Sequence, residues 1–426
     1  MACRPAILWE WFFSEVAVYT GIPRQALNQQ QIKPMSNYDF SQPLSRKKSW
    51  KWEYASIVDG HRVLPMSVAD TDFVSPREVT SALREIIDSG EIGYPSYPDD
   101  HCEVFASWQN KQHGWDLDAD NVTIANGLLS SLVLMLEAVS APDEGVIIFT
   151  PVYHNFFDVI AGVDRVPLCC DLICDEDSQW CVDVSAYQRL CEKRDTKAVI
   201  ICNPHNPVGR AWRTEELRSL VRIAQENNVI VFSDEIHADF VFDQPFNPTI
   251  KAAGNAQGIM TLTSGGKIFN IGGLFASYAV TEDENLKQIL HKALDKLHWE
   301  QNTFSAWGSY TAYKYGFQYR DEVVSYIRKM QTKLVDALND MPFPVKAILP
   351  EATYLLWADF RGTGWTQDAI QRFLLEDAGL GFNRGDSFGA GGSGFVRINC
   401  AVPEFRIDEA IQRLGNALKN RNASSM

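Results

Sequence analysis

The sequence predicts an α/β protein in which a mostly parallel sheet is covered by helices on both faces. Three observations support this class. From about residue 120, short apolar runs alternate with stretches of helical spacing, the 426 residues suit two or three structural units, and no fixed-period repeat is present. Strands separated by helices indicate βαβ units, and open sheets of this kind bind ligands beyond the C-terminal ends of their strands.

The apolar runs predict five strands of this sheet, at Val122–Ala125, Gly145–Thr150, Ala198–Cys202, Val229–Ser233 and Gly258–Thr263. Helical spacing predicts three helices among them, at Leu128–Val139, Thr214–Asn227 and Asn285–Trp299. Strands of this length and composition, buried on both faces, are typical of a parallel sheet.

The last hundred residues change character and predict a smaller α/β unit. A long helix is expected at Tyr319–Asn339, strands at Thr353–Asp359 and Phe395–Asn399, and a final helix at Arg406–Asn420. Residues 37–73 have few helix signals and are expected to pack beside this unit. The predicted organisation is an extension at 1–36, an N-terminal segment at 37–80, a large domain at 81–315 and a small domain at 316–426.

Composition narrows the classes of partner. A net charge of −15 argues against nucleic acid or an anionic membrane as the main partner. Nine cysteines, an odd number without a C-x2-C pair, favour neither a disulfide framework nor a metal site. The apolar stretch Ala6–Tyr19 is interrupted by Glu10 and Glu15, so we expect neither a membrane span nor a secretory signal. A cytoplasmic protein is the default expectation, with the extension as a candidate docking helix.

Two candidate segments place polar side chains where predicted strands end. The prolines and glycine of Asn203–Gly209 force a non-helical turn that can hold the amide of Asn206 at a fixed point, although an ordinary turn has the same pattern. Asp234 ends the next apolar run, and a buried carboxylate is costly unless it meets a positive charge, such as a protonated ring nitrogen. Alone, Asp234 is equally a helix N-cap, and His237 is more often a core histidine.

Two further segments carry cations. The small residues before Lys267 allow the backbone to approach a phosphate, to which Ser264 can donate. A lysine desolvated beside a cationic ring becomes a nucleophile and a base, although a lone lysine after glycines is usually a surface residue. Arg397 lies inside the apolar strand Phe395–Asn399, where a guanidinium needs an anion. A substrate carboxylate fits, and a structural ion pair fits equally well.

Taken together, Asn206, Asp234, Lys267 and Arg397 resemble, in order and spacing, the aspartate-aminotransferase family of pyridoxal-phosphate (PLP) enzymes of fold type I. The resemblance covers roughly Tyr38–Leu418. It implies a PLP-transferase fold with a mostly parallel sheet of the seven-stranded type and a smaller C-terminal domain. It also implies that PLP is held as a Schiff base on Lys267, and that the substrate is a small amino acid.

The resemblance assigns further residues to the site. The amides of Leu128 and Leu129 open a helix and would bind the phosphate, and Tyr153 is placed like the aromatic residue that stacks on the ring. Tyr94 resembles the tyrosine that reaches the phosphate of a neighbouring subunit, which implies a homodimer. Ala69 lies in a segment that resembles the lining of the carboxylate site. The complete cofactor set would be Lys267, Leu128, Leu129, Tyr153, Asn206, Asp234, His237, Ser264 and Tyr94, and the substrate set would be Arg397, Ala69 and Asn206.

Four segments resemble one branch of the family more narrowly, the cystathionine β-lyase or C–S lyase branch. They are residues 68–73, 203–210, 233–239 and 267–271. Most relatives with tyrosine at the position of His237 are aminotransferases, and many aminotransferases carry a phosphate-binding arginine at the position of Phe275. Gly266 departs from the branch, which usually has serine there. The branch implies β-elimination of cystathionine-like or cysteine S-conjugate substrates, including conjugates of secondary metabolism. Transamination by a class I/II aminotransferase stays open, because both reactions share almost every residue, and a regulatory or docking protein is a minor alternative.

Overall fold

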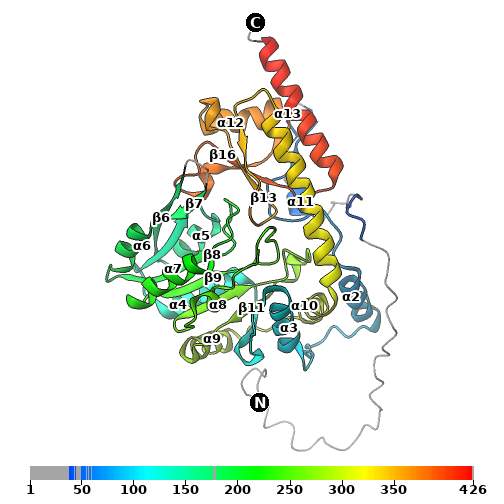
Figure 1. Cartoon of the computed structure of the whole chain (residues 1–426). Helices are drawn as coiled ribbons and strands as arrows, with labels where there is room; N and C mark the ends of the chain where they lie inside the picture. Colours follow the sequence, from blue (N-terminus) through cyan, green and yellow to red (C-terminus); the bar gives the residue numbers. More distant parts are fainter. Residues whose placement is uncertain are drawn as a thin grey trace, which may run out of the picture.

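The computed structural model describes residues 38–424 except 43, 45–48, 54, 56, 59 and 176–178. Its largest element is an eight-stranded sheet with the order β4-β11-β10-β9-β8-β5-β6-β7 (Figure 1). The strands are β4 (Val122–Asn126), β5 (Gly145–Thr150), β6 (Val166–Cys174), β7 (Trp180–Val182), β8 (Thr196–Cys202), β9 (Ile230–Asp234), β10 (Ile259–Thr263) and β11 (Ala276–Val280). Only β11 and β7 pair antiparallel with their neighbours. The predicted mostly parallel sheet is confirmed, with β7 adding an antiparallel edge to the seven-stranded type.

Helices cover both faces of this sheet, as predicted. One face packs against α4 (Leu128–Val139), α5 (Asn155–Gly162) and α9 (Glu284–Leu297), and the other against α3 (His101–His113), α6 (Val184–Cys191), α7 (Thr214–Glu226) and α8 (Thr249–Ala253). Along β8, Ala198 and Ile200 belong to the first core, whereas Val199 and Ile201 belong to the second. Burial on both faces explains why these strands appear as continuous apolar runs.

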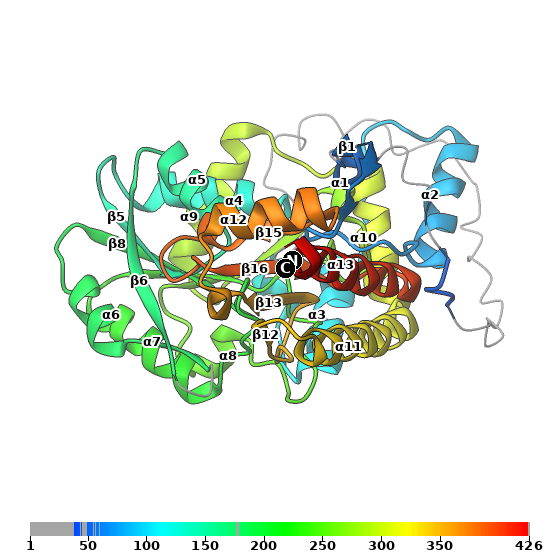
Figure 2. The same cartoon turned by 90° about the horizontal axis from the view of Figure 1, so that it is seen from above.

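The C-terminal unit is built on a four-stranded antiparallel sheet of order β12-β13-β16-β15. Its strands are β12 (Lys346–Ala347), β13 (Leu355–Asp359), β15 (Asn383–Arg384) and β16 (Phe395–Asn399). Figure 2 shows these strands beside α11 (Phe317–Asp340), α12 (Gln367–Arg372) and α13 (Glu404–Ser424). The N-terminal segment contacts this unit through β3 (Leu64–Pro65), which pairs in parallel with β14 (Leu380–Gly381).

Alternate residues of the C-terminal sheet face two different cores. Leu356 and Ala358 belong to the core under α11 and α13, whereas Leu355 and Trp357 join the core of the large sheet. One face of this sheet is therefore directed at the large sheet, and side chains on that face reach the region between the two units.

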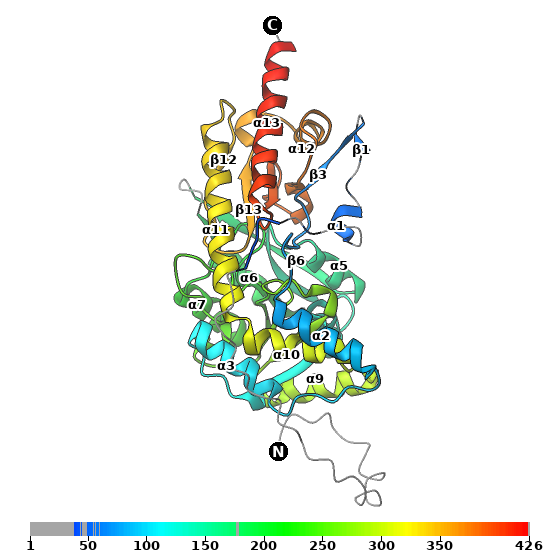
Figure 3. The ribbon, with the colours of Figure 1, turned by 90° about the vertical axis from the view of Figure 1, so that its right-hand side faces the viewer.

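The remaining helices lie at the other end of the molecule. Figure 3 shows α2 (Arg77–Ser89) beside α10 (Thr303–Tyr315), below the lower end of α11. Short elements complete the chain: α1 (Trp50–Glu53), the pair β1 (Ile57–Val58) and β2 (His61–Arg62), 3-10 turns at Ala119–Asn121, Gly272–Leu274, Arg361–Thr363 and Gly385–Phe388, and a π-helical turn at Phe373–Asp377.

The extension at 1–36 lies outside the described residues, and the domain boundaries at 80 and 315 stay predictions. Within the described ranges, no helix is long and apolar enough to cross a membrane. In this part of the chain, seven cysteines are free thiols: Cys169, Cys170, Cys174, Cys181, Cys191, Cys202 and Cys400.

Candidate active site

Three predicted site residues lie at the C-terminal edge of the large sheet. Asp234 is the last residue of β9, and it is in register with Cys202 at the end of β8 and with Leu262 on β10. Asn206 follows β8, and Lys267 follows β10. Since neighbouring parallel strands end at the same edge, residues far apart in sequence meet there.

The turn that carries Asn206 is closed by backbone hydrogen bonds. The amide of His205 donates to the carbonyl of Arg210 at 2.8 Å, and that of Gly209 donates to the carbonyl of His205 at 2.8 Å. Gly209 has φ +73°, a conformation that favours glycine. The turn directs the side chain of Asn206 toward the C-terminal sheet, where its Oδ1 accepts from Nη1 of Arg397 at 3.0 Å.

Arg397 is a buried cation whose hydrogen-bond acceptors, among the described residues, are all neutral oxygens. Its Nη2 donates to the carbonyl of Ser67 at 3.0 Å and to Oδ1 of Asn383 at 2.9 Å, and its guanidinium lies 4.7 Å from the ring centre of Phe388. The side chain is 2% exposed, and its Nε has no partner among the described residues. Burial lowers the pKa of Arg397 to about 10. A guanidinium buried without a carboxylate leaves the site able to accept an anion.

Asp234 is a buried carboxylate, and no cation of the described residues forms an ion pair with it. It accepts a hydrogen bond from the amide of Ile236 at 3.1 Å, and burial raises its pKa to about 6. Lys267 is near enough to lower this pKa only partly. Burial also holds the pKa of His237 well below its ordinary value, so this imidazole is neutral. Its Nδ1 has no partner in the described part of the chain, and neither has the hydroxyl of the neighbouring Tyr354.

Lys267 donates from Nζ to the carbonyl of Ala69 at 2.6 Å. Burial lowers the pKa of Lys267; the charge of Arg397 also lowers it, whereas Asp70 and Asp234 raise it. A lysine with a lowered pKa is more often in the neutral form that acts as a nucleophile or a base. The predicted segment around Ala69 is thus brought to the predicted lysine.

The predicted phosphate-binding helix and stacking residue are also at this edge. Leu128 and Leu129 are the first two residues of α4. The backbone amides of the first turn of a helix have no acceptor within the helix, so these two can donate to a ligand. Gly127, with φ +91°, lets the chain enter the helix at this angle. Tyr153 is partly buried; burial raises its pKa to about 12, with Asp234 raising and Arg397 lowering it, so its ring is near both charges.

Two predicted site residues, Ser264 and Tyr94, make no hydrogen bond to the other predicted site residues in the part of the chain that the structure describes. Ser264 donates its hydroxyl to the carbonyl of Ala276 at 2.6 Å, so it would have to change partner to donate to a phosphate. Tyr94 is fully exposed, at 101% of its reference area, and its role at a neighbouring subunit stays a prediction.

Sequence reasoning missed the residues that hold Arg397 and its strand in place. Ser67, Asn383 and Phe388 carried no motif. Asn399 carried a usable signal, an amide inside an apolar strand: its Nδ2 donates to the carbonyls of Val68 and Asp70, each at 2.7 Å. These bonds fix the N-terminal segment whose carbonyls reach Arg397 and Lys267.

Comparison with known proteins agrees with this geometry. Residues 62–414 match the family model described as aminotransferase class I and II, so the chain belongs to this family of PLP-dependent proteins. It is 29% identical over 386 residues to the cystathionine beta-lyase PatB of Bacillus subtilis, covering 90% of this chain and 100% of that protein. It is 28% identical over 390 residues to Protein MalY of Escherichia coli, covering 90% and 99%. The structure of cystalysin from Treponema denticola, which contains a pyridoxal 5'-phosphate cofactor, aligns with a TM-score of 0.86 at 30% identity over 91% of this chain and 100% of that chain.

Proposed function

We propose that this chain is a PLP-dependent C–S β-lyase that cleaves cystathionine-like or cysteine S-conjugate amino acids by β-elimination. One observation carries the amino-acid part of the proposal. Arg397 and Asp234 are buried charges of opposite sign in one site, and neither has an oppositely charged partner in contact among the described residues. A ligand that supplies an anion to Arg397 and a cation to Asp234 would stabilise both buried groups. The lyase part is supported by the likeness to PatB and cystalysin.

The residues of the site fit PLP. Asp234 would face the protonated ring nitrogen, the amides of Leu128 and Leu129 would bind the phosphate, and Tyr153 would cover the ring. Asn206 and His237 would line the edge of the ring, with His237 neutral because burial lowers its pKa. When bound, PLP supplies an electron sink for a carbanion at Cα of the substrate.

The protein groups then have separate tasks. Arg397 binds the substrate carboxylate with its guanidinium, while the amide nitrogen of Asn206 can donate as well, since its oxygen already accepts from Arg397. Lys267, once free of the cofactor, takes the proton from Cα, and the carbonyl of Ala69 keeps Nζ in place. Breaking the bond between Cβ and sulfur releases a thiol, and uptake of one water gives pyruvate and ammonia.

The decisive assay incubates the PLP-loaded protein with cystathionine in the absence of any 2-oxo acid. Release of thiol, ammonia and pyruvate in equal amounts is the expected result. Turnover that requires an added 2-oxo acid would replace the lyase proposal with an aminotransferase, which the family also contains. A second cysteine S-conjugate in the same assay separates a narrow from a broad side-chain preference.

We also propose that the enzyme is a homodimer with Tyr94 at the interface. Three large apolar side chains near the loop before α3 and the start of α4 are strongly exposed: Tyr94, Ile92 at 58% and Phe275 at 66%. Exposed apolar side chains that gather near a site commonly mark a subunit contact. Sedimentation of the purified protein should give twice the chain mass of 48.0 kDa, and a monomer of full activity would contradict the proposal.

A cytoplasmic location is proposed on the cysteines. Cys169, Cys170, Cys174, Cys181, Cys191, Cys202 and Cys400 are free thiols, and burial raises the thiol pKa of four of them, Cys170, Cys191, Cys202 and Cys400. Free thiols in this number are typical of a reducing compartment. Cell fractionation tests this location.

A further inference from the structure

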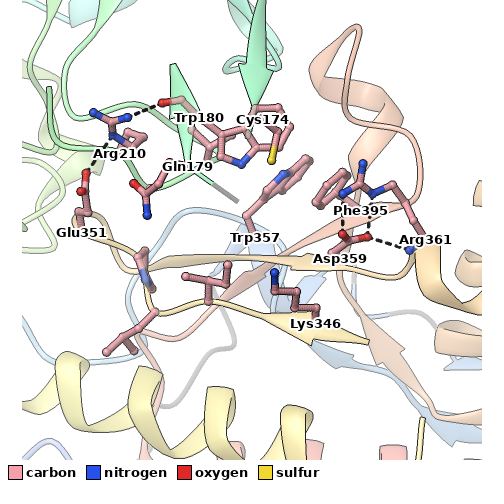
Figure 4. Close-up of a pocket in the computed structure, with 15 residues that line it drawn as sticks. Cys174, Gln179, Trp180, Arg210, Lys346, Glu351, Trp357, Asp359, Arg361 and Phe395 are labelled. Atoms are coloured by element: carbon pink, nitrogen blue, oxygen red, sulfur yellow. Dashed lines mark hydrogen bonds and ion pairs between the residues drawn. The ribbon is translucent and has the colours of Figure 1, made fainter. Parts of the chain in front are cut away.

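Two ion pairs near the C-terminal unit differ in their contact with water. In the pocket of Figure 4, Arg361 pairs with Asp359 at 2.7 Å, and the two side chains are 55% and 19% exposed. In the N-terminal segment, Lys51 of α1 pairs with Asp72 at 2.9 Å, and the two side chains are 0% and 4% exposed. Removing both charges of a pair from water is costly, so the second pair needs a reason beyond the attraction between its charges.

Lys51 fixes one end of residues 67–72, which we call the carbonyl segment. Besides its bond to the carboxylate of Asp72, Nζ of Lys51 donates to the carbonyl of Asp70 at 3.3 Å. The amide of Asp72 donates to the carbonyl of Ala401 at 2.8 Å, just after β16. The carbonyl segment is therefore held between α1 and the end of β16.

The rest of the carbonyl segment reaches the two cations of the proposed active site. The carbonyl of Ser67 accepts from Nη2 of Arg397 at 3.0 Å. The carbonyl of Ala69 accepts from Nζ of Lys267 at 2.6 Å. The carboxylate of Asp70 also acts on Lys267, whose pKa it raises. A displacement of the carbonyl segment would therefore change the surroundings of both cations at once.

We propose that Lys51 is a positioning residue of the active site, acting through the carbonyl segment. The desolvation cost of a buried ion pair largely cancels the attraction, so such a pair does little for stability, whereas its directed bonds restrict where the chain can lie. A misplacement of about 1 Å far from the reacting atoms can lower turnover about 10²-fold. This role rests on the proposed functions of Arg397 and Lys267, and it applies to β-elimination and to transamination alike.

Hydrogen–deuterium exchange of the cofactor-free protein tests the position of the carbonyl segment without any reaction. Lys51→Met keeps most of the length of the side chain but removes its charge and its donors, so the amide of Asp72 should exchange at least about tenfold faster. The amides of β8, β9 and β10 should keep the wild-type rate. Unchanged exchange at Asp72, or equally faster exchange in those three strands, would overturn the proposal, because Lys51 would then position nothing or support the whole fold.

Kinetics of the PLP-loaded Lys51→Met variant test the consequence for the site. Arg397 should lose part of its support, so KM should rise at least about tenfold, and kcat should fall by a smaller factor. This split distinguishes positioning from a general loss of folded enzyme, which would lower kcat and leave KM unchanged. A wild-type KM together with faster exchange at Asp72 would show that the site does not depend on the carbonyl segment, and would overturn the proposal.

Asp72→Asn tests the same bond from its other side. The substitution keeps the size of the side chain and removes its charge, so KM should rise at least about threefold, and this variant decides the question if Lys51→Met does not fold. Because the two residues act through one bond, the double variant Lys51→Met/Asp72→Asn should have the KM of Lys51→Met within about twofold. A wild-type KM in Asp72→Asn, or effects that multiply, would show that Lys51 and Asp72 do not act together.

Lys287 of α9 offers a matched control. Its Nζ also binds a carboxylate, that of Glu284 at 2.7 Å, and an oxygen of another segment, Oδ1 of Asn121 at 3.1 Å. Asn121 precedes β4, so these bonds lie at the edge of the large sheet opposite the proposed site. Lys287→Met should keep the wild-type exchange at Asp72 and the wild-type KM, and changes equal to those of Lys51→Met would overturn the proposal. If the wild type shows no turnover, the proposed function fails, whereas the exchange still tests the link.

Discussion

Asp234 and Lys267 lie at or beyond the ends of neighbouring strands of the large sheet, whereas Arg397 lies in the middle of a strand of the C-terminal sheet. Asp234 and Lys267 lie in one continuous stretch of βα units, which runs from β8 to β10. Arg397 instead takes its partners from residues 67, 206 and 383, far apart in the sequence. Asp234 and Lys267, in the part of the site proposed for the cofactor, are therefore close in the chain, while the part proposed for the substrate forms only when distant segments meet.

The largest expected effect comes from the part proposed for the cofactor. Lys267→Ala removes both the proposed attachment point and the base, so turnover should fall at least about 10³-fold. Turnover and the visible absorbance of the protein with PLP measure the two losses. Lys292→Ala, at an exposed lysine on α9, is the matched control and should match the wild type. Retained turnover in the Lys267 variant would remove this lysine from the mechanism.

The second largest effect is expected at Asp234, where a substitution can remove the charge beside the proposed cofactor ring and keep the shape of the side chain. Asp234→Asn keeps the size of the side chain but removes the charge that would pair with a ring nitrogen, so we expect kcat to fall about 10²-fold to 10³-fold with a smaller change in KM. Steady-state kinetics on the PLP-loaded variant measure this. An unchanged kcat would mean that the carboxylate has a structural role only.

The part proposed for the substrate should respond differently. Arg397→Met removes charge-assisted hydrogen bonds of about 1.5–3 kcal/mol, so KM should rise about 10-fold to 100-fold. Folding stability should hold or increase, because no anion of the described residues contacts the buried guanidinium. Kinetics and urea unfolding measure the two quantities, with Arg372→Met at an exposed site as the control. A marked loss of stability would indicate that Arg397 is a structural residue.

The buried carboxylate also predicts a pH dependence of the cofactor-free protein. The folded-state pKa of Asp234 is raised to about 6, so between pH 4 and 6 the folded chain holds a proton that the unfolded chain releases. This favours folding at low pH, and the contribution, about 3 kcal/mol at most, is lost as the pH rises through that window. Urea unfolding at pH 4.5 and 7 should show a smaller loss for Asp234→Asn than for the wild type.

The stability of Asp234→Asn will still depend on pH. Burial raises the pKa of Glu235 to about 7, so this neighbour contributes with the same sign up to a higher pH. If Asp234→Asn and the wild type lose the same stability between the two pH values, the carboxylate of Asp234 is not the group responsible.

The smallest effect is expected beside the lysine. A Cβ at Gly266 would lie 3.1 Å from Oγ of Ser264 and 3.2 Å from Cα of Gly272, so Gly266→Ser requires shifts of only a few tenths of an ångström. We expect activity to change less than about threefold, since volume changes met by small shifts are usually tolerated. Gly273→Ser, where a Cβ meets nothing within 4 Å, is the control. A tenfold loss of activity in Gly266→Ser but not in Gly273→Ser would show that the loop cannot make these shifts.

Residues that follow a local pattern in the chain could be predicted from the sequence, and residues that depend on tertiary contacts could not. The ends of β8, β9 and β10 carry apolar runs followed by polar residues, so Asn206, Asp234 and Lys267 were recognisable from local pattern, and α4 and β16 have the predicted bounds. β11 was missed because Ala276–Val280 is short and rich in small residues, and β6 because Pro167 and a pair of cysteines interrupt its pattern. Ser67 and Asn383 were out of reach, since their role depends on tertiary contacts that no local pattern encodes.

The carbonyls of residues 67–70, which hold Arg397, Asn399 and Lys267, have a consequence for synthesis in the cell. Ser67 leaves the ribosome 330 residues before its partner Arg397. At about 5–20 residues per second, this is an interval of about 15–65 s in which the carbonyl of Ser67 lacks its native partner Arg397. The site can close only after translation is nearly complete. Chains that terminate early would therefore carry an assembled large sheet and an open carboxylate site, which makes them substrates for chaperones rather than slow enzymes.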